Sequence, residues 1–148
     1  MALFSCVCAL ATACMSPESV ESDVRARIDH LIEASNRRDL DAAVDSYCQD
    51  AVLHPPGGEE VRGRDAIRAR YASLYDNWQP SLSVEHSSTS LARDSATDHG
   101  FIHGRLEPVT PGEDRILEDA YEAVLHCDDG VWRVHELFWR PRATVRAQ

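Results

Sequence analysis

Apolar residues recur at helical spacing in the first half of the chain and at alternate positions in the second half. Within residues 17–38 the apolar positions follow the 3.6-residue period of a helix: Val20, Val24, Ile28, Leu31 and Ile32. Pro17 suits the first turn of this helix, and the acidic residues that follow it complement the helix dipole. Asp39 is predicted to cap a second, shorter helix, whose apolar face carries Leu40, Ala43, Val44 and Tyr47.

A short strand is predicted at residues 50–53, and the sequence HPPGG breaks the chain directly after it. A third helix is predicted to start near Gly63, with Asp65 in its first turn, where a carboxylate favours the dipole. Pro80 is expected to end this helix. The apolar stripe of the helix comprises Ile67, Tyr71, Leu74, Tyr75 and Trp78.

From residue 81 the pattern changes to strict alternation, which predicts strands at residues 81–91, 97–108, 115–127 and 131–141. The sequences VTPGED and CDDG separate the last three strands and are rich in turn residues. Asp129 and Gly130 suit a tight hairpin turn. Helices followed by a meander of strands indicate an α+β domain in which the helices cover one face of the sheet.

The composition narrows the function classes. The chain has 148 residues, the size of one domain, and a formal net charge of −10. All 15 basic residues are arginines, and they are scattered along the chain. A nucleic-acid-binding protein needs a basic footprint, so this class of partner is excluded. No segment is apolar for long enough to span a bilayer.

Residues 1–14, MALFSCVCALATAC, are apolar and unlike the rest of the chain. Three interpretations stay open. The ATAC sequence resembles the lipobox of a bacterial lipoprotein, and cleavage there would leave Cys14 as a lipidated, membrane-tethered N-terminus in the periplasm. Alternatively, translation starts at Met15 and the protein is cytoplasmic, or the segment is a peripheral tail. The lipoprotein is slightly favoured. In each case residues 1–17 lie outside the predicted domain, which spans residues 18–142, and residues 143–148 form a tail.

Three sequence motifs lie at the predicted second helix and first strand, at the start of the third helix, and in the last strand. They are RRDLDAAVDSYCQDAVLHPPG, VRGRDAI and GVWRVHELFW. With these motifs the chain resembles the NTF2-like superfamily, also called the cystatin-like cone, and within it the DUF4440 and SnoaL-like groups. The resemblance covers about residues 20–142. It implies a curved, mostly antiparallel sheet covered by three N-terminal helices, an apolar cavity between them, and a homodimer through the sheet. This fold hosts isomerases, cyclases, hydrolases and non-catalytic binders, so it does not by itself fix the activity.

The first strand and the third long strand hold the candidate acid–base groups. Ketosteroid isomerases, which resemble this chain in fold, have an Asp base before the corresponding Pro, and His54 stands at about that position. A His at the rim of the cone can act as a base, or it can simply be a polar strand end. The same isomerases have a protonated Asp in their oxyanion hole. When the third long strand is aligned with theirs, Glu122 falls near the position of that Asp. Alternation instead puts Asp119 and Tyr121 on the more apolar face, so these two are the better pocket candidates.

Glu136 is predicted to share a strand face with large apolar side chains, namely Trp132, Val134 and Phe138. A carboxylate in such surroundings needs a partner. Arg105 and Glu107 together with Glu136 resemble the Arg-x-Asp plus Asp set of limonene-epoxide-hydrolase-type enzymes, in which one carboxylate activates water and the Arg bridges the two acids. A buried ion pair between two strands is the alternative interpretation.

A cavity of this fold would be lined by aromatic and imidazole side chains, which we expect to be Tyr71, Tyr75, Trp78, Phe101, His103 and Phe138. The remaining histidines are poorly spaced for a metal, and no phosphate loop or dinucleotide motif occurs, so we expect neither a metal nor a cofactor. The sequence therefore predicts a protein that binds a small apolar molecule. If it is an enzyme, the expected chemistry is cofactor-free acid–base isomerisation, cyclisation or epoxide-type hydrolysis; a non-catalytic dimeric binding or assembly module is the alternative.

Overall fold

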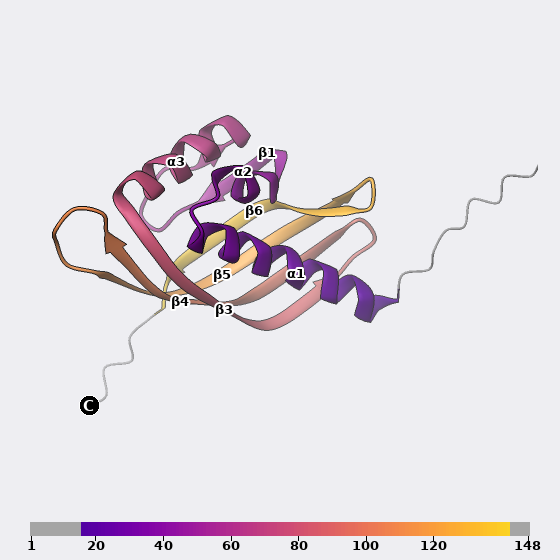
Figure 1. Cartoon of the computed structure of the whole chain (residues 1–148). Helices are drawn as coiled ribbons and strands as arrows, with labels where there is room; N and C mark the ends of the chain where they lie inside the picture. Colours follow the sequence, from indigo (N-terminus) through magenta and orange to yellow (C-terminus); the bar gives the residue numbers. More distant parts are fainter. Residues whose placement is uncertain (1–15, 143–148) are drawn as a thin grey trace, which may run out of the picture.

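The computed structural model describes residues 16–142 and combines three helices with six strands (Figure 1). The helices are α1 (Pro17–Asn36), α2 (Leu40–Asp45) and α3 (Arg64–Asn77). The strands are β1 (Tyr47–His54), β2 (Val61–Arg62), β3 (Trp78–Leu91), β4 (Ser95–Pro108), β5 (Arg115–Asp128) and β6 (Val131–Pro141). The predicted α+β architecture is confirmed.

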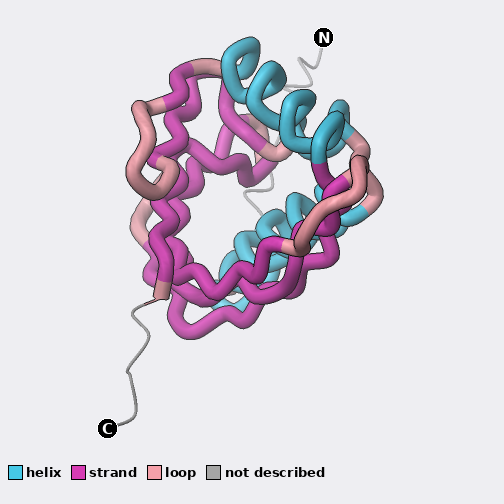
Figure 2. Tube along the Cα trace, turned by 90° about the vertical axis from the view of Figure 1, so that its left-hand side faces the viewer, coloured by secondary structure: helices cyan, strands magenta, loops and turns pink. Residues whose placement is uncertain are grey.

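All six strands belong to one sheet, in the order β2-β1-β6-β5-β4-β3. Only β1 and β6 run parallel, and every other neighbouring pair is antiparallel. Figure 2 shows the long strands curving around one side of the molecule, with the helices lying across the open side. The sheet therefore has a concave face under the helices and a convex outer face. Among residues 16–142, no helix is both long enough and apolar enough to cross a membrane.

The helix starts follow from local capping. The Ser16 hydroxyl accepts a hydrogen bond from the backbone N–H of Ser19, at 3.2 Å, at the start of α1. The Asp39 carboxylate accepts one from the N–H of Ala42, at 3.1 Å, which confirms the predicted cap of α2. Gly63 precedes α3 with φ at 84°, a conformation that side chains disfavour.

The end of α3 differs from the prediction. The helix stops at Asn77, and Trp78 already has extended backbone angles and begins β3. Pro80, expected to end the helix, instead lies inside β3 opposite Leu106. Proline cannot donate to a sheet ladder, but it is tolerated on an edge strand, and β3 is the edge of this sheet. The chain thus passes from helix to strand without a loop.

The hairpin between β5 and β6 turns through Asp129 and Gly130, whose φ angles are 50° and 76°. Two positive φ angles are the signature of the tight turn that matches the twist of the flanking strands. Asp128 and Val131 pair directly across it. The hairpin predicted from the CDDG sequence is confirmed, and it sets the register between β5 and β6.

A β-bulge in β6 reverses the predicted faces of that strand. Val124 pairs with Glu136 while Leu125 pairs with Val134, so His135 is an extra residue on β6. One extra residue exchanges the two faces of everything after it. The buried residues of β6 are Trp132, Val134 and Leu137. The prediction that Glu136 and Phe138 share a face with Trp132 and Val134 is therefore wrong.

Gly100 in β4 marks a close approach between strands, and it gives a first prediction. A Cβ atom at Gly100 would collide with the backbone carbonyl of Glu85 and lie 2.9 Å from the Tyr121 hydroxyl. We expect Gly100→Ala to lower the free energy of unfolding, measured in urea, by about 1–3 kcal/mol or more. Gly112→Ala is the control, because an added Cβ there makes only ordinary contacts, from 3.5 Å. Equal urea midpoints for the two variants would contradict the packing described.

Candidate functional site

A cavity of about 620 Å³ opens between the helices and the concave face of the sheet. Its walls are mainly apolar and come from every layer of the fold. The principal aliphatic contributors are Leu31, Ile32, Leu74, Ile102, Leu106 and Leu117. A cavity of this size and composition suits a small, largely apolar molecule.

Asp119 is the acidic side chain in this cavity wall. It lies on β5, on the concave face, and only 8% of its surface is exposed. Within residues 16–142, no hydrogen bond or ion pair is made to its carboxyl group. Burial raises the pKa of Asp119, because a carboxylate loses hydration in apolar surroundings. An unpaired carboxyl group with a raised pKa in a cleft is suited to proton transfer.

Two tyrosines are paired at the wall of the same cavity. Tyr71 of α3 lines the wall, and its hydroxyl lies 2.7 Å from the hydroxyl of the fully buried Tyr47. Burial raises the pKa of both phenols, and the neighbouring phenol raises that of Tyr47 further. Both groups therefore stay protonated around neutral pH. One phenol hydrogen forms the bond between them, and the other remains available to donate.

Two arginines lie against indole rings of the cavity wall. The Arg70 guanidinium lies 5.8 Å from the ring centre of Trp139, and the Arg115 guanidinium lies 4.8 Å from that of Trp78. All four residues line the cavity. In the described part of the chain, neither arginine has a carboxylate within salt-bridge distance. These cations were not among the residues expected from the sequence.

His54 lies outside the cavity, although its neighbours Leu53 and Pro56 line it. Its ring stacks on that of Phe138, with the ring centres 4.1 Å apart. The His54 Nε2 atom is 3.2 Å from an Oε2 atom of Glu136. Since β1 and β6 run side by side, this contact joins their outer faces. The geometry thus pairs two of the predicted catalytic residues with each other, but away from the cavity.

Tyr121 is concave-facing, as predicted, but its hydroxyl is engaged elsewhere. It donates to the carboxylate of Asp98, at 2.7 Å. Asp98 is fully buried and also bonds to His86 Nδ1 and to the Thr89 hydroxyl, each at 2.7 Å. The His86 Nε2 atom reaches the Asp29 carboxylate at 2.8 Å. This buried network, centred on a residue that the sequence did not single out, holds α1 against β3, β4 and β5.

Arg105 and Glu136 are far apart. Glu136 is in register with Val124 of β5, and Val124 with Thr97 of β4. Thr97 is eight residues from Arg105, which corresponds to about 26 Å along a strand. Arg105 instead pairs with Glu107 at 2.7 Å, on the surface. The arrangement typical of limonene-epoxide-hydrolase-type enzymes is therefore not assembled.

Three of the six expected ligand-binding residues lie on the convex face. Phe101 and His103 alternate with Ile102, which lines the cavity, so they point to the opposite side of β4. His103 lies 3.6 Å from Glu118 of the neighbouring strand. Phe138 follows the bulge in β6 and stacks on His54. The expectation that these three residues line the cavity is corrected.

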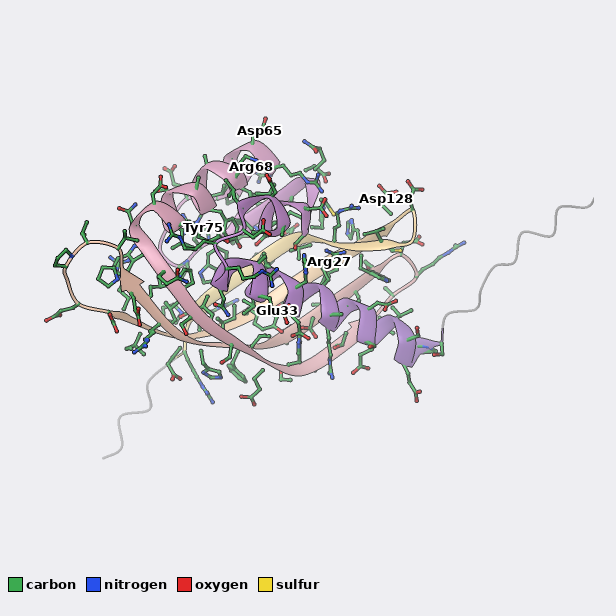
Figure 3. The ribbon with its side chains drawn as sticks, viewed as in Figure 1. Arg27, Glu33, Asp65, Arg68, Tyr75 and Asp128 are labelled. Carbon is green, nitrogen blue, oxygen red and sulfur yellow. The ribbon has the colours of Figure 1, made fainter. Side chains whose placement is uncertain are left out.

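The other three expected ligand-binding residues, Tyr71, Tyr75 and Trp78, belong to α3 and the start of β3. Tyr71 and Trp78 line the cavity as expected. Tyr75 is buried beside it, and its hydroxyl donates to the Ser35 hydroxyl of α1 at 3.2 Å. Figure 3 shows Tyr75 on the inner side of α3 and Asp65 on its outer side. Among residues 16–142, no three His, Cys, Asp or Glu side chains gather in a way that could hold a metal ion.

The fold is shared with several solved structures of low sequence identity. One is a ketosteroid isomerase-like protein from Erwinia carotovora atroseptica SCRI1043, with 19% identity, a TM-score of 0.75, and coverage of 82% of this chain and 95% of that chain. Another is a candidate scytalone dehydratase from Novosphingobium aromaticivorans DSM 12444, with 12% identity, a TM-score of 0.74, and coverage of 87% and 95%. A third is a candidate dehydratase of the NTF2-like family from Streptomyces avermitilis, with 15% identity, a TM-score of 0.75, and coverage of 87% and 100%. At these identities the likeness shows the fold alone.

No curated protein matches the chain by sequence. The SnoaL-like domain family matches residues 28–135, which run from the middle of α1 into β6. This match covers most of the chain, and it agrees with the NTF2-like fold of the structural neighbours. Membership of the DUF4440 group stays a prediction. The chain belongs to the family of SnoaL-like domains within the NTF2-like superfamily.

Proposed function

We propose that the cavity binds a small, largely apolar molecule and that Asp119 exchanges a proton with it, in a cofactor-free acid–base reaction. The observation that carries the proposal is a single unpaired carboxyl group, 8% exposed, in an apolar cavity wall. The raised pKa of Asp119 makes its carboxylate a stronger base than an exposed aspartate. The same shift makes the protonated form available to return the proton.

The residues suggest a sequence of proton movements. The Asp119 carboxylate removes a proton from a carbon next to a carbonyl group, and the electron pair of that C–H bond moves onto the carbonyl oxygen. The Tyr71 hydroxyl, supported by Tyr47, donates a hydrogen bond to this oxygen. Protonated Asp119 then returns the proton to another atom of the ligand. Return to a different carbon gives isomerisation, and return to a leaving hydroxyl gives dehydration with release of water. In a cyclisation, the enolate carbon bonds to a second carbonyl carbon of the ligand, whose C=O electron pair moves to its oxygen, and this oxygen takes the proton.

The names of the structural neighbours are consistent with this class of reaction. One neighbour is named as ketosteroid isomerase-like, and two are named as candidate dehydratases. Epoxide-type hydrolysis is not favoured, because Arg105 and Glu136 do not share a site. His54 has no role in the proposal, since it lies outside the cavity.

The alternative is a non-catalytic dimeric binding or assembly module. A cavity filled by side chains, with Glu136 paired to Arg105, would have favoured it. The cavity is open, and Glu136 contacts His54 instead. A homodimer through the convex face of the sheet remains compatible with either function and stays a prediction. So does a lipid anchor at Cys14, which lies outside the described residues.

The proposal can be tested with 5-nitrobenzisoxazole, an apolar probe. When a base removes its C3 proton, the ring N–O bond breaks and a coloured cyanophenolate forms. We expect the full chain to accelerate this reaction far beyond acetate at the same concentration, because the base is desolvated in the cavity. The neutral competitor 2-naphthylmethanol should slow it. A rate equal to that of acetate, or no effect of the competitor, would contradict a base within the cavity.

A further inference from the structure

We propose that the ligand carries a planar anionic group, such as a carboxylate, which Arg115 binds at the end of the cavity remote from Asp119. The inference rests on the proposed function, because it assigns a substrate class to the same site. Arg115 is an exposed cation that lines the wall of an apolar cavity. Within residues 16–142, Arg115 has neither a salt bridge nor a side-chain hydrogen bond.

Several arginines of residues 16–142 form no ion pair, and among these Arg70 and Arg115 line the cavity. The chain carries 25 acidic against 15 basic residues, so carboxylates are abundant. The neighbouring Asp114 lies 3.8 Å from Arg105, and other arginines also have acidic partners, such as Arg68 with Asp41. An acidic protein generally repels anions. The unpaired guanidinium of Arg115 provides a local attraction for an anion at the wall of the cavity.

The indole of Trp78 holds this guanidinium in place. The Arg115 guanidinium carbon lies 4.8 Å from the centre of the Trp78 ring. Such a cation–π contact restricts the long side chain while leaving the edge of the guanidinium available. That edge presents paired N–H donors, which match a carboxylate in a bidentate manner. The arrangement lowers the entropic cost of binding an anion.

The position of Arg115 relative to Asp119 defines the shape of the ligand. Arg115, Leu117 and Asp119 alternate along β5, and all three line the cavity. Four residues of strand separate Arg115 from Asp119 by about 13 Å between Cα atoms. Apolar side chains, including Leu117 and Leu106, occupy the interval. A matching ligand has an anionic group at one end, an apolar body, and the reacting carbon near the other end.

Arg70 offers a second cation, but a less suitable one. It lies over Trp139 of β6, which is adjacent on the sheet to Tyr121 rather than to Arg115. Its positive charge also acts on the buried Tyr47–Tyr71 pair, where it opposes the burial that raises the pKa of both phenols. An anion bound there would lie at the tyrosine end of the cavity. The proposal therefore places the anion at Arg115 and predicts a different result for the two arginines.

Calorimetric titration with 2-naphthoate and 2-naphthylmethanol, which share one ring system and differ in charge, tests this inference. We expect the wild-type protein to bind 2-naphthoate about tenfold more tightly than the alcohol. Arg115→Gln should abolish that preference and leave the affinity for the alcohol within twofold. Arg105→Gln, which removes the same charge from an ion pair on the protein surface, is the matched control and should change neither affinity.

The outcomes separate this inference from the proposed function. Equal affinity of the wild-type protein for the two probes would overturn the inference while leaving the cavity and its base intact. Loss of the preference in Arg70→Gln but not in Arg115→Gln would also overturn it. Failure of both probes to bind, together with failure to convert 5-nitrobenzisoxazole, would overturn the proposed function itself. Circular dichroism of each variant shows whether a lost affinity reflects unfolding.

Discussion

Asp119→Asn is expected to slow proton abstraction from 5-nitrobenzisoxazole by about a hundredfold or more. The substitution preserves the shape of the side chain but removes the base. Loss of the rate should not come from unfolding, because a buried, unpaired carboxylate destabilises the native state. We therefore expect Asp119→Asn to raise the free energy of unfolding at pH 7 by roughly 1 kcal/mol, measured in urea.

The pH dependence of both quantities follows from the raised pKa of Asp119. The ordinary value is 3.8, and burial raises it in the folded protein. The folded state thus binds the proton more tightly than the unfolded state, so the wild type loses stability as pH rises through the folded pKa. The stability gained by Asp119→Asn should be present at neutral pH and vanish below about pH 4. The wild-type rate should rise as the pH rises through the folded pKa of Asp119, because the carboxylate is the active form.

Glu122→Gln is the matched control for this prediction. Glu122 lies on the same strand but on its convex face, where its carboxylate contacts His99 at 3.1 Å. Removing its charge should change the rate by less than twofold. If Asp119→Asn kept the wild-type rate, or if Glu122→Gln lost as much, the catalytic carboxyl group would lie elsewhere.

Asp98→Ala is expected to lower the free energy of unfolding by about 3–5 kcal/mol, the largest stability effect that we predict. Asp98 is fully buried and accepts hydrogen bonds from Tyr121 and Thr89, each at 2.7 Å, while its third contact is to His86. Truncation leaves these buried polar groups without their shared acceptor. Chemical denaturation in urea at pH 7 measures the loss.

A second variant separates the buried centre of the network from its edge. Asp29 contacts the outer nitrogen of His86 and is half exposed. Asp29→Ala should therefore cost less than about 1 kcal/mol, as is usual for a solvated pair. Similar small losses for Asp98→Ala and Asp29→Ala would show that the network does not stabilise the contact between α1 and the sheet.

Much of the fold could be predicted because its signals are local. Asp39 caps α2 through its own side chain, and Asp129–Gly130 turns the last hairpin through its own backbone angles. The position of Pro80 could not be predicted locally, because a proline within β3 is tolerated only if β3 is an edge strand. The bulge at His135 likewise depends on pairing with β5, which alternation along β6 alone does not reveal.

The candidate site was predictable only where alternation was unbroken. Asp119 lies on the regular strand β5, and its concave position is as expected. Arg115 precedes Leu117 by two residues, so the same alternation places it on the concave face. This alternation is the sequence signal that could have identified Arg115 as a cavity residue. Phe101 belongs to the opposite face of β4, because aromatic character does not reveal which of two alternating faces meets the helices.

The Asp119 carboxyl titration, followed by carbon-13 NMR with and without 2-naphthylmethanol, tests the central claim most directly. The resonance can be assigned by its absence in Asp119→Asn. We predict a midpoint above the ordinary aspartate value of 3.8 in the free protein. The midpoint should rise further when the probe displaces water from the cavity, because the carboxylate loses its remaining hydration. A midpoint at the ordinary value, unchanged by the probe, would contradict the assignment of Asp119 as the reactive group of this cavity.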